Sequence, residues 1–327
     1  MNTELERNGP GLFLRDILRD EADIIAAAQL IARSQADVVV LQGLDWDHGQ
    51  AALSAFRQSV NGLGGQFDTQ FTLVPNAGKP TSLDLDGDGY LRGAADAEGF
   101  GAFPGQGGMA VLSRWPVELE HDFTDLVWSQ MPDTAILAND PGFEERRLSS
   151  FGHWVLRVTP DDAKPFTVMA FHASPPVFDG PEDLNGRRNR DETLLWVHLL
   201  DGRLNAPPPK DRFAVAGVAN ADPFDGDARR DGIHALLRHK AIQDTRPRDD
   251  IGRHLAVADG GVNTKHAGDP AMDTANWSDD GPGNLRVDYV LPSADWRVAG
   301  SGILWAEPDE DGIPALRHGL VWVDVAP

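Results

Sequence analysis

Six short motifs spread along the whole chain constrain its fold more than any other feature. Most consist of an apolar run followed directly by polar residues, the pattern of a buried strand that ends at a sheet edge. Strand-like and helix-like segments follow one another without strict alternation, which suits two packed sheets flanked by helices. In chain order the motifs are residues 37–47 (DVVVLQGLDWD), 107–116 (GGMAVLSRWP), 171–174 (FHAS), 216–223 (AGVANADP), 286–291 (RVDYVL) and 317–324 (RHGLVWVD).

Taken in order, these motifs resemble those of the endonuclease/exonuclease/phosphatase family, whose fold is DNase I-like. The resemblance covers nearly the whole chain, and it is closest to a bacterial branch that also carries the blocks at 175–183 and 185–189. It implies an α+β protein, a four-layer α/β/β/α sandwich with two mainly antiparallel sheets between helices. Because the motifs run from one end to the other, we expect one domain over residues 1–327.

Three positions at which the family has metal-site acids hold other residues here. Gly43 stands in place of a metal-binding Glu, Val218 in place of an Asp, and Arg317 in place of the Asp before the terminal His. The resemblance implies a metal-dependent phosphoesterase that uses Mg²⁺ or Mn²⁺ on carboxylate and amide oxygens. Losing three acids of one site predicts weak or absent metal-dependent activity. Acids close in sequence could rebuild the site, and the candidates are Asp45, Asp47 and Asp222.

Five polar residues match positions that the family uses in its active site. By resemblance, His172 contacts the phosphate, Asn220 orients the nucleophile and Asp288 supports the site. His318 matches the terminal catalytic His, and Asn2 matches a first-strand Asn that helps to hold the metal or the phosphate. Since each follows or begins a predicted strand, we expect all five to meet around one cleft with the three substituted positions.

Arg317 suggests an alternative use of the same cleft. A guanidinium pairs with phosphate or carboxylate through two parallel hydrogen bonds, so Arg317 could bind a small phosphorylated or anionic ligand without catalysis. The polar block after His172 would border the cleft and contribute Arg187, Arg188 and Asn189 to ligand binding. The competing interpretations are a surface Arg317 paired with an acid, and a solvated loop and helix N-terminus for the block.

The segment 84–90 (DLDGDGY) is a second, independent signal. Alternating Asp residues followed by Gly match the first half of a Ca²⁺-binding loop, in which Gly allows the sharp turn. A turn-rich acidic loop without an ion is the alternative. A third interpretation of the whole chain is a Ca²⁺-stabilised exported protein with a vestigial cleft. We expect Ca²⁺ here, with ligands from Asp84, Asp86, Asp88, the Tyr90 carbonyl and Asp96.

The charge of the chain limits its partners. Lys and Arg number 29 against 51 Asp and Glu, for a formal net charge of -22. Such a surface repels polyanions, whereas binding to duplex DNA needs cations against the phosphates. This argues against bulk duplex nucleic acid and favours a small ligand on a monomer. No apolar run is long enough for a membrane span. Related proteins are often exported, although no leader sequence follows Met1.

Apolar spacing also predicts the main elements. Two stretches rich in Gly and Asp, 75–107 and 246–283, are predicted to be irregular. Helices are expected over 11–34, 51–60 and 191–200, and strands over 36–41, 109–112, 154–158, 166–171, 213–216, 287–291 and 320–325.

Overall fold

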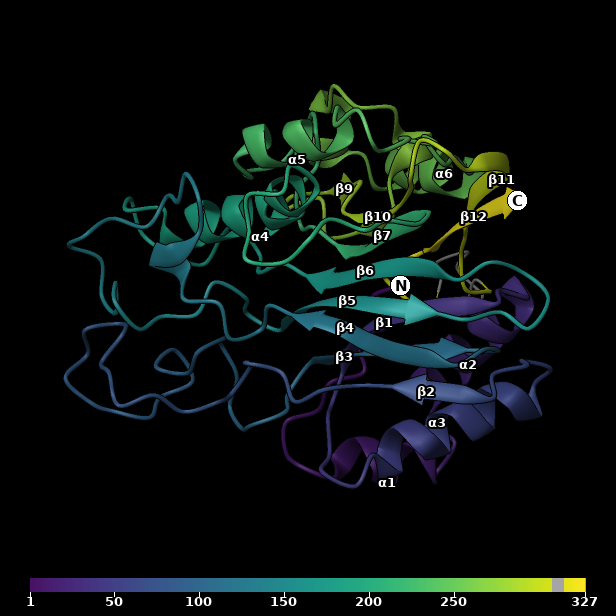
Figure 1. The fold of residues 1–327 in the computed structure, drawn as a ribbon, viewed down its shortest axis with the longest axis horizontal. Helices are drawn as coiled ribbons and strands as arrows, with labels where there is room; N and C mark the ends of the chain where they lie inside the picture. Colours follow the sequence, from purple (N-terminus) through teal and green to yellow (C-terminus); the bar gives the residue numbers. More distant parts are fainter. Residues whose placement is uncertain (308–314, 327) are drawn as a thin grey trace.

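The computed structural model of the chain describes residues 1–307 and 315–326. Two β-sheets pack face to face, and helices cover the outer face of each (Figure 1). Three large clusters of buried apolar side chains fill the spaces between successive layers. The four-layer α/β/β/α sandwich expected from the motifs is therefore confirmed.

The first sheet and its helices come from the N-terminal third of the chain. The sheet contains β1 (Val38–Leu44), β2 (Thr69–Phe71) and β3 (Gly108–Ser113), antiparallel in the order β1-β3-β2. Its outer face is covered by α1 (Leu12–Ile17), α2 (Ala22–Ser34) and α3 (Ala51–Gly62). Phe13 and Phe56 from the helices pack with Leu41 and Leu112 from the strands, because these apolar positions recur on one face of each element.

The second sheet has the order β10-β7-β6-β5-β4. All neighbouring strands are antiparallel except β6 and β7, which are parallel and joined by a crossover through a helix. The strands are β4 (Val117–Asp122), β5 (Gly152–Val158), β6 (Phe166–His172), β7 (Phe213–Val218) and β10 (Asp288–Pro292), and the covering helices are α4 (Leu184–Leu200) and α5 (Arg230–Leu237).

The two sheets meet through apolar side chains of both inner faces. Val40 and Met109 of the first sheet share one buried cluster with Trp154, Val168 and Ala216 of the second. Because alternate residues of a strand face opposite sides, strands with apolar residues throughout are buried between the other sheet and the helices. The apolar runs predicted as strands were all found as strands, with ends that differ by up to three residues.

Except for η1 (Trp128–Gln130), the remaining elements lie in the C-terminal quarter of the chain. A two-stranded ribbon pairs β11 (Arg297–Leu304) with β12 (Leu320–Ala326), so the last predicted strand pairs with β11 and not with the large sheets. Within the described residues, no helix is long and apolar enough to span a bilayer. The short elements are α6 (Asp250–Asp259), β8 (Ala275–Asn276), β9 (Asn284–Leu285), η1 (Trp128–Gln130), η2 (Gly261–Lys265) and η3 (Pro270–Met272).

Three predictions about element boundaries were wrong. The expected helix over 11–34 is broken between α1 and α2, where Asp20 takes a left-handed φ of 52° that no helix contains. The stretch 246–283, expected to be irregular, contains α6, which begins where the Asp249 side chain accepts a hydrogen bond from the Ile251 backbone N–H. Helix α4 also begins at Leu184, seven residues before the predicted start at Asp191.

Candidate functional site

A cleft with a volume of about 590 Å³ opens where strands of both sheets end. Gly43 comes from the end of β1, His172 from the end of β6, and Asn220 from the turn after β7. Most of the residues expected at the site line this single cleft, which also has an apolar wall that includes Phe151, Phe178 and Trp277. The expected lining residues are Asn2, Gly43, His172, Asn220, Arg317 and His318.

Asp288 and His318 form a buried pair at the floor of the cleft. Nδ1 of His318 lies 2.8 Å from Oδ2 of Asp288, which also accepts a hydrogen bond from the Thr274 hydroxyl. Burial raises the pKa of Asp288, but the charge and hydrogen bond of His318 more than offset it, and the pKa is lowered overall. The other ring nitrogen of His318, Nε2, lies 3.3 Å from Nδ2 of Asn2.

Strand register places Val218 between two polar residues of the site. Val218 pairs with His172 on β6 and with Asp288 on β10, so the three side chains share one face of the sheet. A buried isopropyl group therefore occupies the position between them. Burial and the neighbouring His318 lower the pKa of His172 to about 3, so its ring is neutral, stacked on Phe151 with ring centroids 4.0 Å apart.

Gly43 leaves no room for the side chain that the family has at this position. Its φ is +71°, and a Cβ built there would lie 2.6 Å from Oδ1 of Asn2 and 2.8 Å from the backbone nitrogen of Glu4. The register of β1 against β3 shifts at the same point, between Gln42 and Leu44. Replacing this residue with Glu would require the N-terminal segment to move.

Glu4 is a cleft residue that the motifs did not single out. Oε2 of Glu4 lies 3.5 Å from Nε of Arg317, and Oε1 lies 3.8 Å from Nε2 of His318. Arg317 is therefore paired with an acid, as one of its two interpretations expected, and it lies beside His318 at the cleft. The signal available in the sequence was its place two residues after Asn2, a position expected at the site.

Arg187 and Arg188 lie outside the cleft lining, contrary to the expectation that they contact a ligand. Arg187 forms two hydrogen bonds with the carboxylate of Asp140, at 2.5 and 3.0 Å, and both side chains are buried. Arg188 is also buried and donates to four backbone carbonyl oxygens. The guanidinium groups fasten α4 to neighbouring loops. The alternative of a helix N-terminus fits these two residues, which lie in the first turns of α4, but they are buried and not solvated.

Asn189 supports the cleft from behind instead of lining it. Its Nδ2 donates to the carbonyls of Ser174 and Ala219, both at 2.7 Å, and so joins the loops that follow β6 and β7. Asn220, on the second of these loops, has a left-handed φ of 48° and donates to the carbonyl of Ala173. Asn220 is therefore held at the cleft by hydrogen bonds between the two loops.

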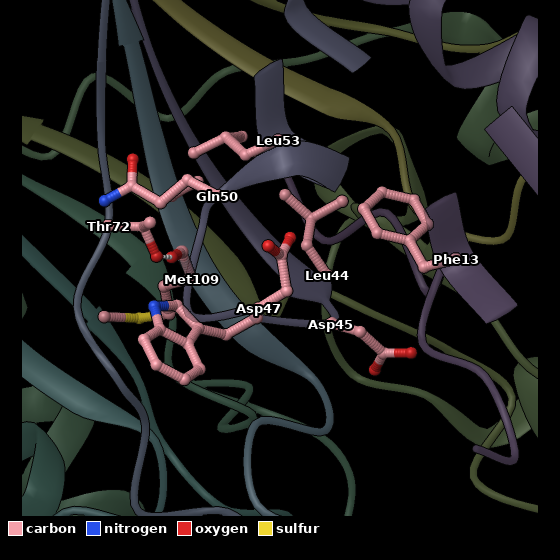
Figure 2. Close-up of a pocket in the computed structure, with 10 residues that line it drawn as sticks. Phe13, Leu44, Asp45, Asp47, Gln50, Leu53, Thr72 and Met109 are labelled. Carbon is pink, nitrogen blue, oxygen red and sulfur yellow. Dashed lines mark hydrogen bonds between the residues drawn. The ribbon is translucent and has the colours of Figure 1, made fainter. Parts of the chain in front are cut away.

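The acids that could have rebuilt a metal site are bonded to backbone N–H groups. Both oxygens of Asp45 accept such bonds, Asp47 caps the first turn of α3, and Asp222 accepts three. Figure 2 shows the carboxylates of Asp45 and Asp47 pointing in different directions beside a separate small pocket. They do not converge on one point at the cleft.

The donors around the cleft do not fit a divalent metal ion. In the part of the chain that the structure describes, only one group of three acidic or His ligands is close enough to hold an ion, and it lies elsewhere. Glu4 is the carboxylate that faces Nε2 of His318. The cation of Arg317 lies beside this carboxylate and would repel a metal ion bound there. Gly43 and Val218 supply no donor atom from their side chains.

The group of three is the predicted acidic loop, which could bind a metal ion. One carboxylate oxygen from each of Asp84, Asp86 and Asp88 lies within 4.8 Å of the others. Tyr90 donates its backbone N–H to Asp88 and exposes its side chain. Asp96 does not join this set as expected, because it is buried and both its oxygens accept backbone N–H bonds that shape the loop.

Comparisons with known proteins agree with this architecture. The profile of the endonuclease/exonuclease/phosphatase family matches residues 6–312, and the chain belongs to this family, whose members usually use divalent metals. No curated protein matches the sequence.

Solved structures of the same fold are similar over the whole chain. An endonuclease/exonuclease/phosphatase from Beutenbergia cavernae DSM 12333 has a TM-score of 0.56 at 15% identity, covering 99% of this chain and 68% of that one. A family protein from Leptotrichia buccalis C-1013-b has a TM-score of 0.53 at 13% identity, covering 100% and 97%. Sphingomyelinase C from Streptomyces griseocarneus has a TM-score of 0.50 at 17% identity, also covering 100% and 97%. At these identities the likeness shows the fold alone.

Proposed function

We propose that the cleft binds a small phosphorylated or otherwise anionic ligand, and that metal-dependent phosphodiester hydrolysis there is weak or absent. The observation that carries this proposal is the position of Arg317. Its guanidinium lies at the cleft, is about half exposed at 47%, and adjoins His318. An accessible guanidinium pairs bidentately with phosphate oxygens, whereas it disfavours a divalent ion in the same place.

Neighbouring residues supply the other contacts that an anion needs. The amide groups of Asn2 and Asn220 offer N–H donors at the cleft. Asp288 fixes the orientation of the His318 ring from behind. Hydrolysis of a phosphodiester also needs strong charge stabilisation of the phosphoryl oxygens, which a metal supplies in this family. The cleft has one guanidinium for that purpose, which supports binding more than turnover.

Turnover of bis(4-nitrophenyl) phosphate tests the catalytic half of the proposal. We expect no increase over background when Mg²⁺ or Mn²⁺ replaces EDTA. His318→Gln is the control, because activity that persists in this variant comes from a contaminant. Robust hydrolysis that EDTA and His318→Gln both abolish would instead support the alternative, a metal-dependent phosphoesterase with a rebuilt site.

We also propose that the acidic loop binds Ca²⁺ through Asp84, Asp86 and Asp88. Three carboxylates this close repel one another, and an ion that binds only the folded chain raises its stability. Millimolar Ca²⁺ should raise the melting temperature of the parent and not of Asp86→Ala with Asp88→Ala. A matched pair of exposed acids, Asp161→Ala with Asp162→Ala, should respond like the parent. An unchanged melting temperature in the parent would leave an acidic turn without an ion.

A further inference from the structure

The segment that carries Glu4 runs along β1 and is joined to it by one parallel bridge, between Asn2 and Gln42. Backbone N–H groups of Thr3 and Leu5 donate to the carbonyls of Gln42 and Gly43, at 2.9 and 2.7 Å. The side chains of Thr3 and Leu5 are buried on one face, at 2% and 0% exposure. The side chain of Glu4, between them in sequence, lines the cleft.

The backbone of Glu4 is held there in an unfavourable conformation. Its φ is 48°, in the left-handed region where residues other than Gly are uncommon. Its N–H donates to Oδ1 of Asn2, and it passes so close to Gly43 that a Cβ at that position would lie 2.8 Å from the Glu4 nitrogen. Strain of this kind persists only when surrounding contacts enforce it, and it concentrates at functional sites.

The carboxylate of Glu4 faces the guanidinium that an anionic ligand would use, and it also lies beside His318. It lies 3.5 Å from Nε of Arg317 and 3.8 Å from Nε2 of His318. The side chains of Glu4 and Arg317 are 33% and 47% exposed, so their ion pair is weak and exchangeable. A metal-ligand role is the rival explanation, but the adjacent guanidinium opposes it.

We propose that Glu4 is a built-in counter-ion of the cleft, and that an anionic ligand binds by displacing its carboxylate from Arg317. This inference rests on the proposed function and adds the residue that sets the affinity. A ligand must then pair with Arg317 better than a carboxylate does, which favours a phosphate group with several oxygens over weakly pairing monoanions such as chloride. Removing the Glu4 charge should strengthen binding of the anionic ligand, because the ligand then no longer has to displace the Glu4–Arg317 ion pair.

Calorimetric titration of phenyl phosphate into the protein in EDTA tests this inference. Glu4→Gln should bind about fivefold more tightly than the parent, the factor that corresponds to an exposed ion pair. Glu6→Gln is the matched control, because Glu6 lines the same cleft and its removal changes the net charge equally. Glu6→Gln should gain clearly less affinity for phenyl phosphate than Glu4→Gln. Glu4→Asn provides a second neutral variant, since Asn tolerates a left-handed φ better than most residues.

The outcomes separate the inference from the function on which it rests. Affinity in Glu4→Gln and Glu4→Asn that is equal to or below that of Glu6→Gln would overturn the counter-ion role while the parent still binds. Binding that requires Mn²⁺ in the parent and is lost in Glu4→Gln would make Glu4 a metal ligand and overturn it as well. Absence of phenyl phosphate binding in every protein would overturn the proposed function and the inference together.

Discussion

His318 and Asp288 lie 30 residues apart in sequence, yet Nδ1 of one is 2.8 Å from Oδ2 of the other. Asp288 is ionised because its pKa is lowered, so it can only accept, and the nearby Nδ2 of Asn2 can only donate. This network assigns the proton of neutral His318 to Nδ1 and leaves Nε2 as an acceptor at the cleft. The two contacts together fix the orientation of the His318 ring.

The first prediction concerns this tautomer. Side-chain ¹H–¹⁵N spectra above pH 8 should show His318 protonated at Nδ1 in the parent. In Asp288→Asn the proton should shift at least partly to Nε2, because an amide can donate to Nδ1. Spectra of the parent with the proton at Nε2 would contradict the assigned network. His318→Gln identifies the resonance.

The second prediction concerns Gly43. Gly43→Ala should destabilise the protein by about 2–4 kcal/mol in urea unfolding, from a left-handed φ together with the clash against Asn2 and Glu4. Gly202→Ala is the matched control, because Gly202 has a similar φ of +68° and no atom within 4 Å of the added carbon. Gly202→Ala should lower the free energy of unfolding by about 1–2 kcal/mol. Equal costs at the two positions would show that the N-terminal segment moves freely.

Restoring the family acids should fail for the same reason. Gly43→Glu introduces the clash described above, so combining it with Val218→Asp and Arg317→Asp is expected to destabilise the fold before it creates a metal site.

The third prediction concerns acid stability. Burial lowers the pKa of His172 to about 3, against about 6.5 when unfolded, so the unfolded chain takes up the proton first. The stability contributed by neutral His172 is fully present above about pH 6.5, the unfolded pKa. It is lost as the pH falls toward the pKa of His172 in the folded chain. Between pH 7.5 and 5.5 the parent should lose about 1.3 kcal/mol more than His172→Asn.

This comparison isolates one titrating group. The pKa of Asp273 is raised to about 8 by burial and neighbouring acids, and it contributes the opposite slope over the same range. Such groups are common to both proteins and cancel in the difference. Identical pH dependence in parent and variant would mean that His172 is solvated and not buried.

The fourth prediction concerns Arg187. Arg187→Ala should cost about 3–5 kcal/mol of stability, because it leaves the buried carboxylate of Asp140 without its partner. Affinity for phenyl phosphate should stay the same. The double variant with Asp140→Ala should cost less than the sum of the two single variants. Loss of affinity for phenyl phosphate with unchanged stability would instead support the expectation that Arg187 contacts the ligand.

Much of the fold could be predicted because its signals are local. The apolar runs of β1 and β6 define buried strands from composition alone, and a strand delivers the residue at its end to a sheet edge. Together with the order of the motifs that resemble the family, this is why His172, Asn220 and His318 could be expected at one cleft. The break after α1 gave no such signal, because apolar spacing continues through Asp20.

The missed features depend on partners that are distant in sequence. Arg187 and Arg188 have the composition of a ligand-binding block, but Asp140 and backbone carbonyls far along the chain engage them. Glu4 faces the cleft because Gly43 lacks a side chain, and only the pairing of the N-terminal segment with β1 makes the two residues neighbours. A single sequence carries no direct record of either pairing.

The central claim is that Arg317, and not a metal ion, holds the anionic group of a ligand in the cleft. The most direct measurement is calorimetric titration of phenyl phosphate into the parent and Arg317→Gln, each in EDTA and again in Mg²⁺. We predict binding to the parent in EDTA, little change with Mg²⁺, and at least about tenfold weaker binding to Arg317→Gln, as expected for a lost charge-assisted pair. Binding that is absent in EDTA, appears with Mg²⁺ and persists in Arg317→Gln would contradict the claim.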